Sequence, residues 1–282
     1  MTTTITIPAS SVYMLVGHNY FKKFIPLVSQ TWKRLNIADW LSYSQDAQSS
    51  GIIPATLSNK EQLAALSSSA SSSFNDGLDL LLQPTLTVDE VVSKKAKLEA
   101  FKADERLKTL VNDQINTSYG IHNEEDAIKQ SGLNITRCQE QFILSVYKDE
   151  LVIEPELPSK SIEYVVIGRV DGITDTGEIV EIKNRIRECT GIIRNYEIPQ
   201  IMIYMHMAGT DRGYIIEKWK ENIKIINVTY IPNYFDTIVK PAIVKYTTFI
   251  AEFIKSDIMK KYAINGDECA LYQCYLKATM RA

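Results

Sequence analysis

The chain has 282 residues, 45% of them hydrophobic and 23% charged, and its formal net charge is −3. This is a globular composition, long enough for one large domain or for one domain with a helical extension. The charge gives no molecule-wide signature of nucleic-acid binding, so a polyanion would have to meet a local basic patch. No apolar run reaches the length of a membrane span, and the N-terminus lacks the features of a secretory signal. We therefore expect an intracellular protein without a membrane partner.

Four cysteines are scattered along the chain, and none of them forms a C-x-x-C pair. This spacing argues against a zinc or iron–sulfur site. We expect all four to be reduced thiols; they are Cys138, Cys189, Cys269 and Cys274.

Residues 1–110 are expected to form a helical portion packed on the rest of the chain. A helix over residues 10–36 should break near Gly17, and a serine-rich, mobile excursion with one short helix should follow over residues 42–86. A longer helical pattern begins at the capping sequence that opens with Thr87 and runs on past residue 110.

Residues 111–282 alternate helices with strands, which indicates an α/β domain built around a mixed sheet. A helix is expected to begin near Gly120, and an apolar helix should open at Pro199, which suits a first helical turn. The expected strands are residues 138–147, 163–170, a return strand ending near 185, 213–219 and 223–230, and a closing helix should cover residues 234–254.

The centre of this domain is residues 164–185, where two apolar, β-branched runs flank a polar turn. This pattern is typical of a β-hairpin in a buried sheet. Asp171 ends the first strand, and Glu181 and Lys183 lie in the second. Side chains alternate along a strand, so Glu181 and Lys183 should face one way and Ile182 the other, into the core. Burying two acids and an amine together is costly unless they pair or bind a metal.

Two carboxylates on this hairpin, joined by a third from a helix, would provide the oxygen ligands that hard divalent cations prefer. The backbone carbonyl of Ile182 is a further candidate ligand. A lysine beside such ions can activate a water or stabilise charge on a phosphate. Asp171, Glu181 and Lys183 therefore fit metal-assisted hydrolysis of a phosphodiester. The alternative is a buried salt bridge between Lys183 and one of the acids.

An acidic pair precedes the hairpin on the expected helix. Glu124 and Glu125 are adjacent, so only one of them can face a common site. Exposed acids near a helix start are ordinary because they complement the helix dipole. From this pair alone, a solvent-exposed position is the expectation for both.

Polar groups also follow the hairpin. A local basic cluster comes first, formed by Arg185, Arg187 and Arg194. Gln200 and Tyr204 lie four residues apart on the next helix and share one face. His206 falls on a different face, and we expect it to be a packed core histidine.

These motifs together resemble the PD-(D/E)xK nuclease superfamily, in its lambda-exonuclease-like and RecB-like branch of viral or phage alkaline exonuclease type. Asp171 followed by Glu181-Ile182-Lys183 matches the acid and the E-x-K of the core. Gly120-Ile-His-Asn-Glu124 is similar to the helix that supplies an additional acid, which selects Glu124 over Glu125. Gln200-Ile-Met-Ile-Tyr204 matches the Q-x-x-x-Y helix. The similarity covers residues 118–209, with a loose match over residues 8–23.

The resemblance implies a restriction-endonuclease-like fold, with a mixed central sheet flanked by helices and an N-terminal helical portion. It also implies a Mg²⁺- or Mn²⁺-dependent deoxyribonuclease, with an exonuclease acting at DNA ends in replication, recombination or repair favoured. One or two ions would be held by Glu124, Asp171, Glu181 and the Ile182 carbonyl. Lys183 would position the attacking water or stabilise the transition state. The nucleotide would be oriented by Gln200 and Tyr204, and the candidate phosphate contacts are Arg185, Arg187 and Arg194.

Several alternatives stay open at this point. A structure-specific or restriction-type endonuclease would use the same residues, as would an endoribonuclease, although the Q-x-x-x-Y helix argues for DNA. A non-catalytic nucleic-acid-binding protein could keep the fold without the chemistry. The cysteine spacing does not match that of iron–sulfur relatives, and there is no G-x-x-x-x-G-K-[ST] helicase motif. Relatives of this type can form a trimeric ring, and a recombination or replication partner would suit a viral or phage protein acting in the cytoplasm or nucleus of its host.

Overall fold

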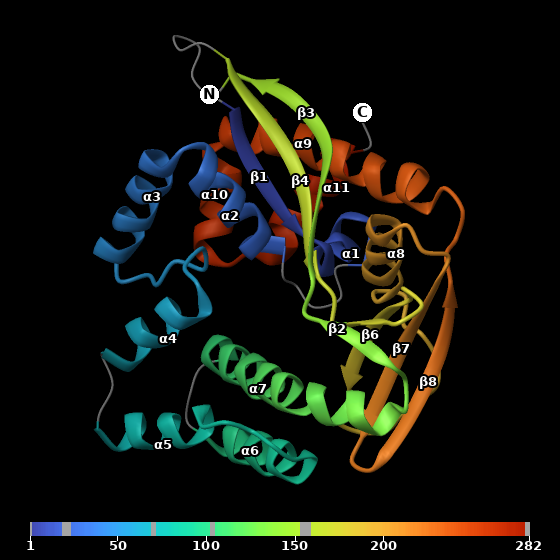
Figure 1. Ribbon diagram of the computed structural model, residues 1–282. Helices are drawn as coiled ribbons and strands as arrows, with labels where there is room; N and C mark the ends of the chain where they lie inside the picture. The colour runs from blue at the N-terminus through green and yellow to red at the C-terminus, as the bar shows by residue number, and fades with distance from the viewer. Residues whose placement is uncertain (1, 19–23, 69–71, 102–104, 153–158, 280–282) are drawn as a thin grey trace.

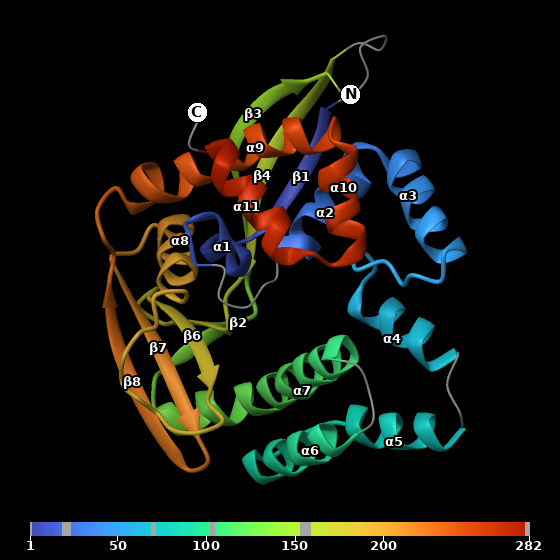
Figure 2. The same ribbon diagram turned by 180° about the vertical axis from the view of Figure 1, so that it is seen from behind.

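The computed structural model describes residues 2–18, 24–68, 72–101, 105–152 and 159–279. These residues form two sheets and the helices packed around them (Figures 1 and 2). Residues 19–23 of the loosely matching segment 8–23 lie outside the described residues.

The first sheet has three strands in the order β1-β4-β3, namely β1 (Thr2–Pro8), β3 (Gln141–Leu151) and β4 (Lys160–Arg169). The first strand runs parallel to β4, and Ile5 lies opposite Tyr164. Strand β3 runs antiparallel to β4. We did not predict β1 from the sequence, because Thr2, Thr3 and Thr4 make this segment polar. Threonine is nevertheless a β-branched residue that favours strands.

The second sheet has five strands in the order β2-β5-β6-β7-β8. The parallel pair is β6 and β7, and the other neighbours are antiparallel. Its strands are β2 (Ile135–Cys138), β5 (Gly172–Thr174), β6 (Ile179–Asn184), β7 (Arg212–Trp219) and β8 (Asn222–Thr229).

The expected hairpin is present, but its strands do not lie in one sheet. Strands β5 and β6 pair antiparallel across a tight turn in which Gly177 has φ 91°, a left-handed conformation that glycine adopts without a steric cost. The first apolar run is divided at Val170 and Asp171, so that β4 pairs in the first sheet and only β5 pairs with β6. The expectation of a single sheet was wrong, because hydrophobic alternation does not show where a strand changes partner.

The N-terminal half is more helical than expected. Its elements are η1 (Ala9–Ser11), α1 (Val12–Leu15), α2 (Phe24–Leu35), α3 (Ile37–Ser49), α4 (Asn59–Ser68), α5 (Ser72–Leu82), α6 (Val88–Ala100) and α7 (Glu105–Ser131). The chain leaves the helical path at Gly17, with φ 98°, as expected. The serine-rich excursion was expected to hold one short helix, but α3, α4 and α5 all fall within or overlap it.

Helix α6 begins with the capping box predicted from sequence, in which Thr87 and Glu90 exchange side-chain and backbone hydrogen bonds. The following helix, α7, is continuous over 27 residues, so Gly120 lies inside it and does not open a new helix. The expected division between residues 110 and 111 also falls inside α7. The chain before this point shares a sheet with the chain after it, through the pairing of β1 with β4.

The C-terminal half follows the expected order closely. Helix α8 (Ile198–Ala208) carries Pro199 in its first turn and ends at Gly209, which has φ 66°. It is followed, after β7 and β8, by a π-helical turn η2 (Phe235–Val239) that leads into α9 (Lys240–Ile254). Two helices that the sequence left open complete the chain, α10 (Asp257–Asn265) and α11 (Glu268–Thr279).

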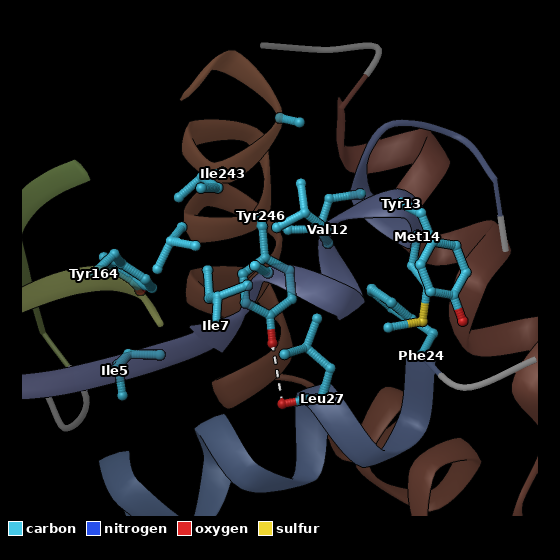
Figure 3. Packing of buried hydrophobic residues seen from close by; sticks show 14 of the residues in the cluster. Ile5, Ile7, Val12, Tyr13, Met14, Phe24, Leu27, Tyr164, Ile243 and Tyr246 are labelled. Atoms are coloured by element: carbon cyan, nitrogen blue, oxygen red, sulfur yellow. Dashed lines mark hydrogen bonds between the residues drawn. The ribbon is translucent and has the colours of Figure 1, made fainter. Parts of the chain in front are cut away.

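The main hydrophobic core joins the two ends of the chain. Phe24 of α2 packs its ring against Tyr246 of α9 and Tyr275 of α11. Figure 3 shows this region, where the Tyr246 hydroxyl donates a hydrogen bond of 3.3 Å to the carbonyl of Leu27. A second cluster lies among α5, α6 and α7 and contains Val91 and Val111. In both ribbon views α5 and α6 lie on the side of α7 away from the first sheet (Figures 1 and 2).

The second sheet is covered by a helix on each face. Ala127 of α7 packs with Val180 and Ile182 of β6, whereas α8 contacts the same sheet through Ile201 and Met205 in the main core. The protein is thus a mixed α/β protein with helices flanking its sheets, as the sequence predicted at this level. In the part of the chain that the structure describes, no helix is long and apolar enough to cross a membrane.

Candidate active site

Strand β6 directs Glu181 and Lys183 to one face. Val180 and Ile182 point to the other face, where they pack against α7, and this alternation was predicted from the sequence. The Glu181 side chain is 6% exposed and that of Lys183 is 21% exposed, and the Lys183 Nζ lies 2.7 Å from Glu181 Oε1. The salt bridge considered as an alternative is therefore present.

Lys183 is also connected to the helix that follows the hairpin. Its Nζ donates a hydrogen bond of 3.1 Å to Gln200 Oε1, and Gln200 Nε2 donates one of 3.1 Å to the Tyr204 hydroxyl. The shared face predicted for Gln200 and Tyr204 is thus confirmed. Tyr204 packs over Gly168 of β4, where a Cβ atom would overlap its ring. A glycine inside a strand pattern can mark such a close approach.

Asp171 lies at the point where the chain passes from the first sheet to the second. Its Oδ2 accepts a hydrogen bond of 2.6 Å from the backbone N–H of Ile182. The side chain thus takes the place of a strand partner just before β5 begins. On a strand, the N–H and C=O of one residue point to the same side. The Ile182 carbonyl therefore points toward Asp171 as well, which is the arrangement that its predicted role as a ligand requires.

Glu124 approaches this region from α7. Its Oε2 accepts a hydrogen bond of 3.0 Å from Gln139 Nε2. Glu125 instead points to solvent, where it forms a 2.7 Å ion pair with Lys129. The choice of Glu124 over Glu125 is supported by this geometry.

A cleft of about 380 Å³ brings these groups together. Glu124, Asp171, Gln200 and Tyr204 line it. Glu181 and Lys183 are not part of the lining, but Lys183 joins both of them to it through its hydrogen bond with Gln200. The rest of the wall comes from the end of β1, from η1 and β4, and from Gln139 and Gln141, so both halves of the chain contribute to the cleft. The remaining residues are Pro8, Ala9, Ser10, Ile167, Gly168 and Arg169.

The carboxylates of the cleft repel one another. Burial raises the pKa of Asp171 well above its usual value of 3.8, and the negative charge of Glu181 is the second cause. Burial and the charge of Glu181 also raise the pKa of Glu124. Burial opposes the charge on Lys183, but the nearby Glu181 and Asp171 outweigh it and raise the pKa of the lysine. The charges of Arg169 and Lys183 oppose these increases in the pKa of Glu124 but do not reverse them.

The donor set fits a hard divalent cation by its chemistry. Glu181 Oε2 is buried and has no hydrogen-bond partner, which is a costly state for a carboxylate oxygen. A cation would satisfy this oxygen and relieve the repulsion felt by Asp171. In the described ranges of the chain, no three Asp, Glu, His or Cys side chains are close enough as they stand to form one coordination group. The residues of the site thus match a divalent cation in the type and charge of their ligand atoms.

The basic cluster divides into two parts. Arg185 is buried and forms ion pairs with two carboxylates, at 2.6 Å to Glu197 and 2.6 Å to Glu217. These contacts occupy its guanidinium and tie it to the protein, so the structure does not support Arg185 as a phosphate contact. Arg187 and Arg194 are exposed. They line a second cleft of about 500 Å³ together with Lys95, which we call the basic cleft.

Among the lining residues that the sequence did not single out, Gln139, Gly168 and Arg169 contribute most to the site. Gln139 supports Glu124 and has a φ of 57°, which is uncommon for a residue other than glycine and often occurs at functional sites. Arg169 ends β4 and lines the cleft. Gly168 makes room for Tyr204. Only the glycine carried a signal in the sequence, since neither a turn glutamine nor a strand-end arginine is distinctive by itself.

Two other predictions concern residues outside the cleft. His206 stacks on Phe235 with ring centroids 4.2 Å apart, which confirms that it is packed, although it is half-buried rather than in the core. The four cysteines are free thiols, as expected.

The fold and site together define the class of protein, a mixed α/β protein with a carboxylate–lysine cluster beside a cleft. No family model matches the sequence, and no curated protein matches it. A solved structure described as "Crystal structure of SSO0001" is similar, with a TM-score of 0.33 and 16% sequence identity. The alignment covers 68% of this chain and 85% of that chain.

Proposed function

We propose that this protein is a divalent-metal-dependent deoxyribonuclease of the PD-(D/E)xK type, with the restriction-endonuclease-like core that this type implies. One observation carries the proposal: Asp171, just before β5, meets the β6 strand that carries Glu181 and Lys183 beside a cleft, and a buried carboxylate oxygen of Glu181 has no partner among the described residues. A purely structural ion pair explains Lys183 and Glu181. It does not explain why Asp171 and Glu124 are placed where their charges repel that of Glu181.

The proposed ligands of one or two Mg²⁺ or Mn²⁺ ions are the carboxylates of Glu124, Asp171 and Glu181 and the carbonyl of Ile182. When bound, the metal supplies Lewis-acid stabilisation of the phosphate and a more acidic water. Lys183, held by Glu181 and Gln200, donates hydrogen bonds to the attacking water or to a phosphate oxygen. Its raised pKa keeps it charged at neutral pH, so it can stabilise the negative charge that develops on the phosphorane.

Gln200 and Tyr204 are proposed to orient the nucleotide at the cleft. Gln200 contacts both Lys183 and Tyr204. A shift of Gln200 or Tyr204 would therefore displace Lys183 as well. Because a misplacement of about 1 Å can cost on the order of 100-fold in rate, we expect these two residues to affect turnover as well as substrate binding.

The central test is the substitution Lys183→Ala. We expect it to lower the rate of DNA cleavage by about 100-fold or more, the scale on which loss of one preorganised charge acts. DNA binding in Ca²⁺ should remain nearly intact. The measurement is cleavage of end-labelled linear duplex and single-stranded DNA in Mg²⁺, with chelator as the zero-activity control. Lys129→Ala, which removes an exposed lysine that pairs with the solvent-facing Glu125, is the matched control. Full activity of Lys183→Ala on every DNA that the wild type cleaves would overturn the assignment.

The preference for an exonuclease rests on the resemblance to alkaline exonucleases and is tested separately. An exonuclease degrades linear DNA and leaves covalently closed circular DNA intact. Nicking or linearisation of the closed circle would show an endonuclease with the same catalytic residues. If the protein bound no Mg²⁺ or Mn²⁺ at millimolar concentration by calorimetry, a non-catalytic role would replace the proposal.

A further inference from the structure

The basic cleft lies at the C-terminal end of β6, the strand that carries Glu181 and Lys183. Its lining begins with Asn184, the last residue of β6 and the neighbour of Lys183, and continues along the chain that leaves the strand. Figure 2 shows the end of β6 pointing toward the side of the molecule where α6 and α7 lie. The lining residues that carry the argument are Lys95, Arg187 and Arg194.

Lys95 occupies an unusual position on α6. It lies four residues after Val91 and three before Leu98, both of which are buried in the cluster shared with α7, so it is on the inward face of the helix. Lysines are rarely turned inward without a carboxylate partner. Lys95 is half-buried and has no hydrogen bond or ion pair within the described part of the chain.

The cleft holds these positive charges close together without a matching number of acids. Burial lowers the pKa of Lys95, and the positive charge of Arg187 lowers it further, while Asp113 acts in the opposite direction. One guanidinium nitrogen of Arg194 donates to the Tyr196 hydroxyl at 2.7 Å, and its other guanidinium donors bond to none of the described residues. The lining contains one acid, Glu188, and Arg185 adds no free charge because it is paired with two carboxylates.

The surrounding packing holds the cleft in shape. Arg185 is fixed by its ion pairs, and the next residue, Ile186, packs against the cluster that contains Val91 and Leu98. The segment after β6 is thus anchored to the cluster shared by α5, α6 and α7 and, through Glu197, to the start of α8. Arg187 follows these anchors, lines the cleft and is exposed.

We propose that the basic cleft, through Lys95, Arg187 and Arg194, binds a phosphate of the DNA strand next to the phosphate that is cleaved. This inference rests on the proposed function, because it takes the strand at the carboxylates to be DNA. It adds a residue from α6, and it gives the helices before α7 a direct part in holding the substrate. A phosphate oxygen would take hydrogen bonds from an ammonium and two guanidinium groups and relieve their mutual repulsion.

The test compares Lys95→Met and Arg187→Met with the control Lys97→Met. Lys97 is an exposed lysine on the same helix and does not line the cleft, so its removal changes the net charge equally. Binding of fluorescein-labelled single-stranded and duplex DNA is followed by anisotropy in Ca²⁺, over salt concentrations from about 50 to 200 mM. Loss of one phosphate contact should make the slope of log K against log salt shallower by about 0.7–0.9.

We expect both cleft variants to show this shallower slope for every sequence, with Lys97→Met unchanged. In Mg²⁺, the KM for DNA should rise while kcat stays within about twofold, because a contact made equally in ground and transition states affects binding alone. Oligonucleotides with and without a 5′-phosphate identify the source of the phosphate. An equal effect on both indicates an internal phosphodiester, and a larger effect on the phosphorylated strand indicates a terminal phosphate.

The two proposals fail in different ways. A wild-type protein that neither binds nor cleaves DNA would remove the proposed function and this inference with it. A wild-type protein that binds and cleaves DNA, with Lys95→Met and Arg187→Met matching Lys97→Met in slope and KM, would overturn the basic cleft alone. Circular dichroism and thermal unfolding of the three variants establish that each is folded before the comparison.

Discussion

At the scale of single residues, the candidate site is defined by charges that are not fully compensated. Asp171 accepts the Ile182 N–H, and Glu181 accepts from Lys183, yet one carboxylate oxygen of Glu181 is buried without a partner. An arrangement like this is expected to lower the stability of the folded protein in the absence of a ligand, which is common where a site is built for function.

Asp171 should make the metal-free protein less stable as the pH rises. Its folded pKa is raised above the usual 3.8 by burial and by Glu181, so the folded state binds this proton more tightly than the unfolded state does. The stability that the proton gives is complete below about pH 4 and is lost as the pH rises toward the raised folded pKa. Asp171→Asn should therefore raise the melting temperature in chelator at pH 8 more than at pH 5.

Thermal unfolding in chelator, from pH 5 to pH 8, measures this difference. Asp211→Asn, at an exposed position in the turn before β7, is the control and should follow the wild type at each pH. Adding Mg²⁺ should stabilise the wild type more than Asp171→Asn, because only the wild type retains the full ligand set. An Asp171→Asn protein less stable than the wild type at pH 8 in chelator would contradict this account.

At the scale of elements, the segment after β6 is held by Arg185. Its guanidinium contacts Glu197 at the start of α8 and Glu217 in β7, and Glu217 also accepts from the backbone of Gly191 at 2.7 Å. One side chain thus fixes a helix, a strand and a loop relative to Lys183. The sequence indicated a basic cluster here but not the two carboxylates, which come from positions 12 and 32 residues further along.

Arg185→Ala should be strongly destabilising, by about 3–5 kcal/mol, because it leaves two buried carboxylates without their partner. Arg187→Ala, two positions away and exposed, should change the free energy of unfolding by no more than about 0.5 kcal/mol. Urea unfolding of the two variants provides the comparison. Replacing Glu197 and Glu217 by glutamine in the Arg185→Ala background should recover part of the loss, and an additive further loss would argue against the ion-pair account.

Much of the site was predictable from local sequence. The alternation along β6 placed Glu181 with Lys183, and helical spacing placed Gln200 with Tyr204, because both depend only on backbone periodicity. The support for Glu124 by Gln139 and the burial of Arg185 depend on tertiary contacts, to which no local pattern corresponds. The change of sheet between Val170 and Asp171 was missed for the same reason, since both sides of the bend are apolar and strand-like.

At the scale of the whole molecule, the first residues of the chain pack against elements from its middle and its C-terminal end. Strand β1 pairs with β4, so that Thr2 lies opposite Ser161, and the hydroxyls of Tyr272 and Tyr275 donate to the carbonyls of Met14 and Leu15 at 2.8 Å each. The segment that leads out of β1 also forms part of the cleft wall. The N-terminal segment is therefore part of the framework of the site.

Ile7→Ala tests this role of β1. Ile7 is fully buried in the main core, and its truncation should cost about 2–5 kcal/mol of folding free energy. Thr4→Ala, at an exposed position of the same strand, should cost about 0.5 kcal/mol or less. The measurement is chemical denaturation of both variants. Equal, small effects would show that β1 contributes little to the core.

The pairing of β1 with β4 also has a consequence for synthesis on the ribosome. The partner of Thr2 is made 159 positions later, and the tyrosines that bond to Met14 and Leu15 are made about a hundred positions after that. Until then Ile5 and Ile7 have no strand to pair with, and the apolar residues of α1 and α2 have no α9 or α11 to cover them. Nascent chains of this protein should therefore complete their main core late, and holdase chaperones that bind exposed apolar segments should find their sites near its N-terminus.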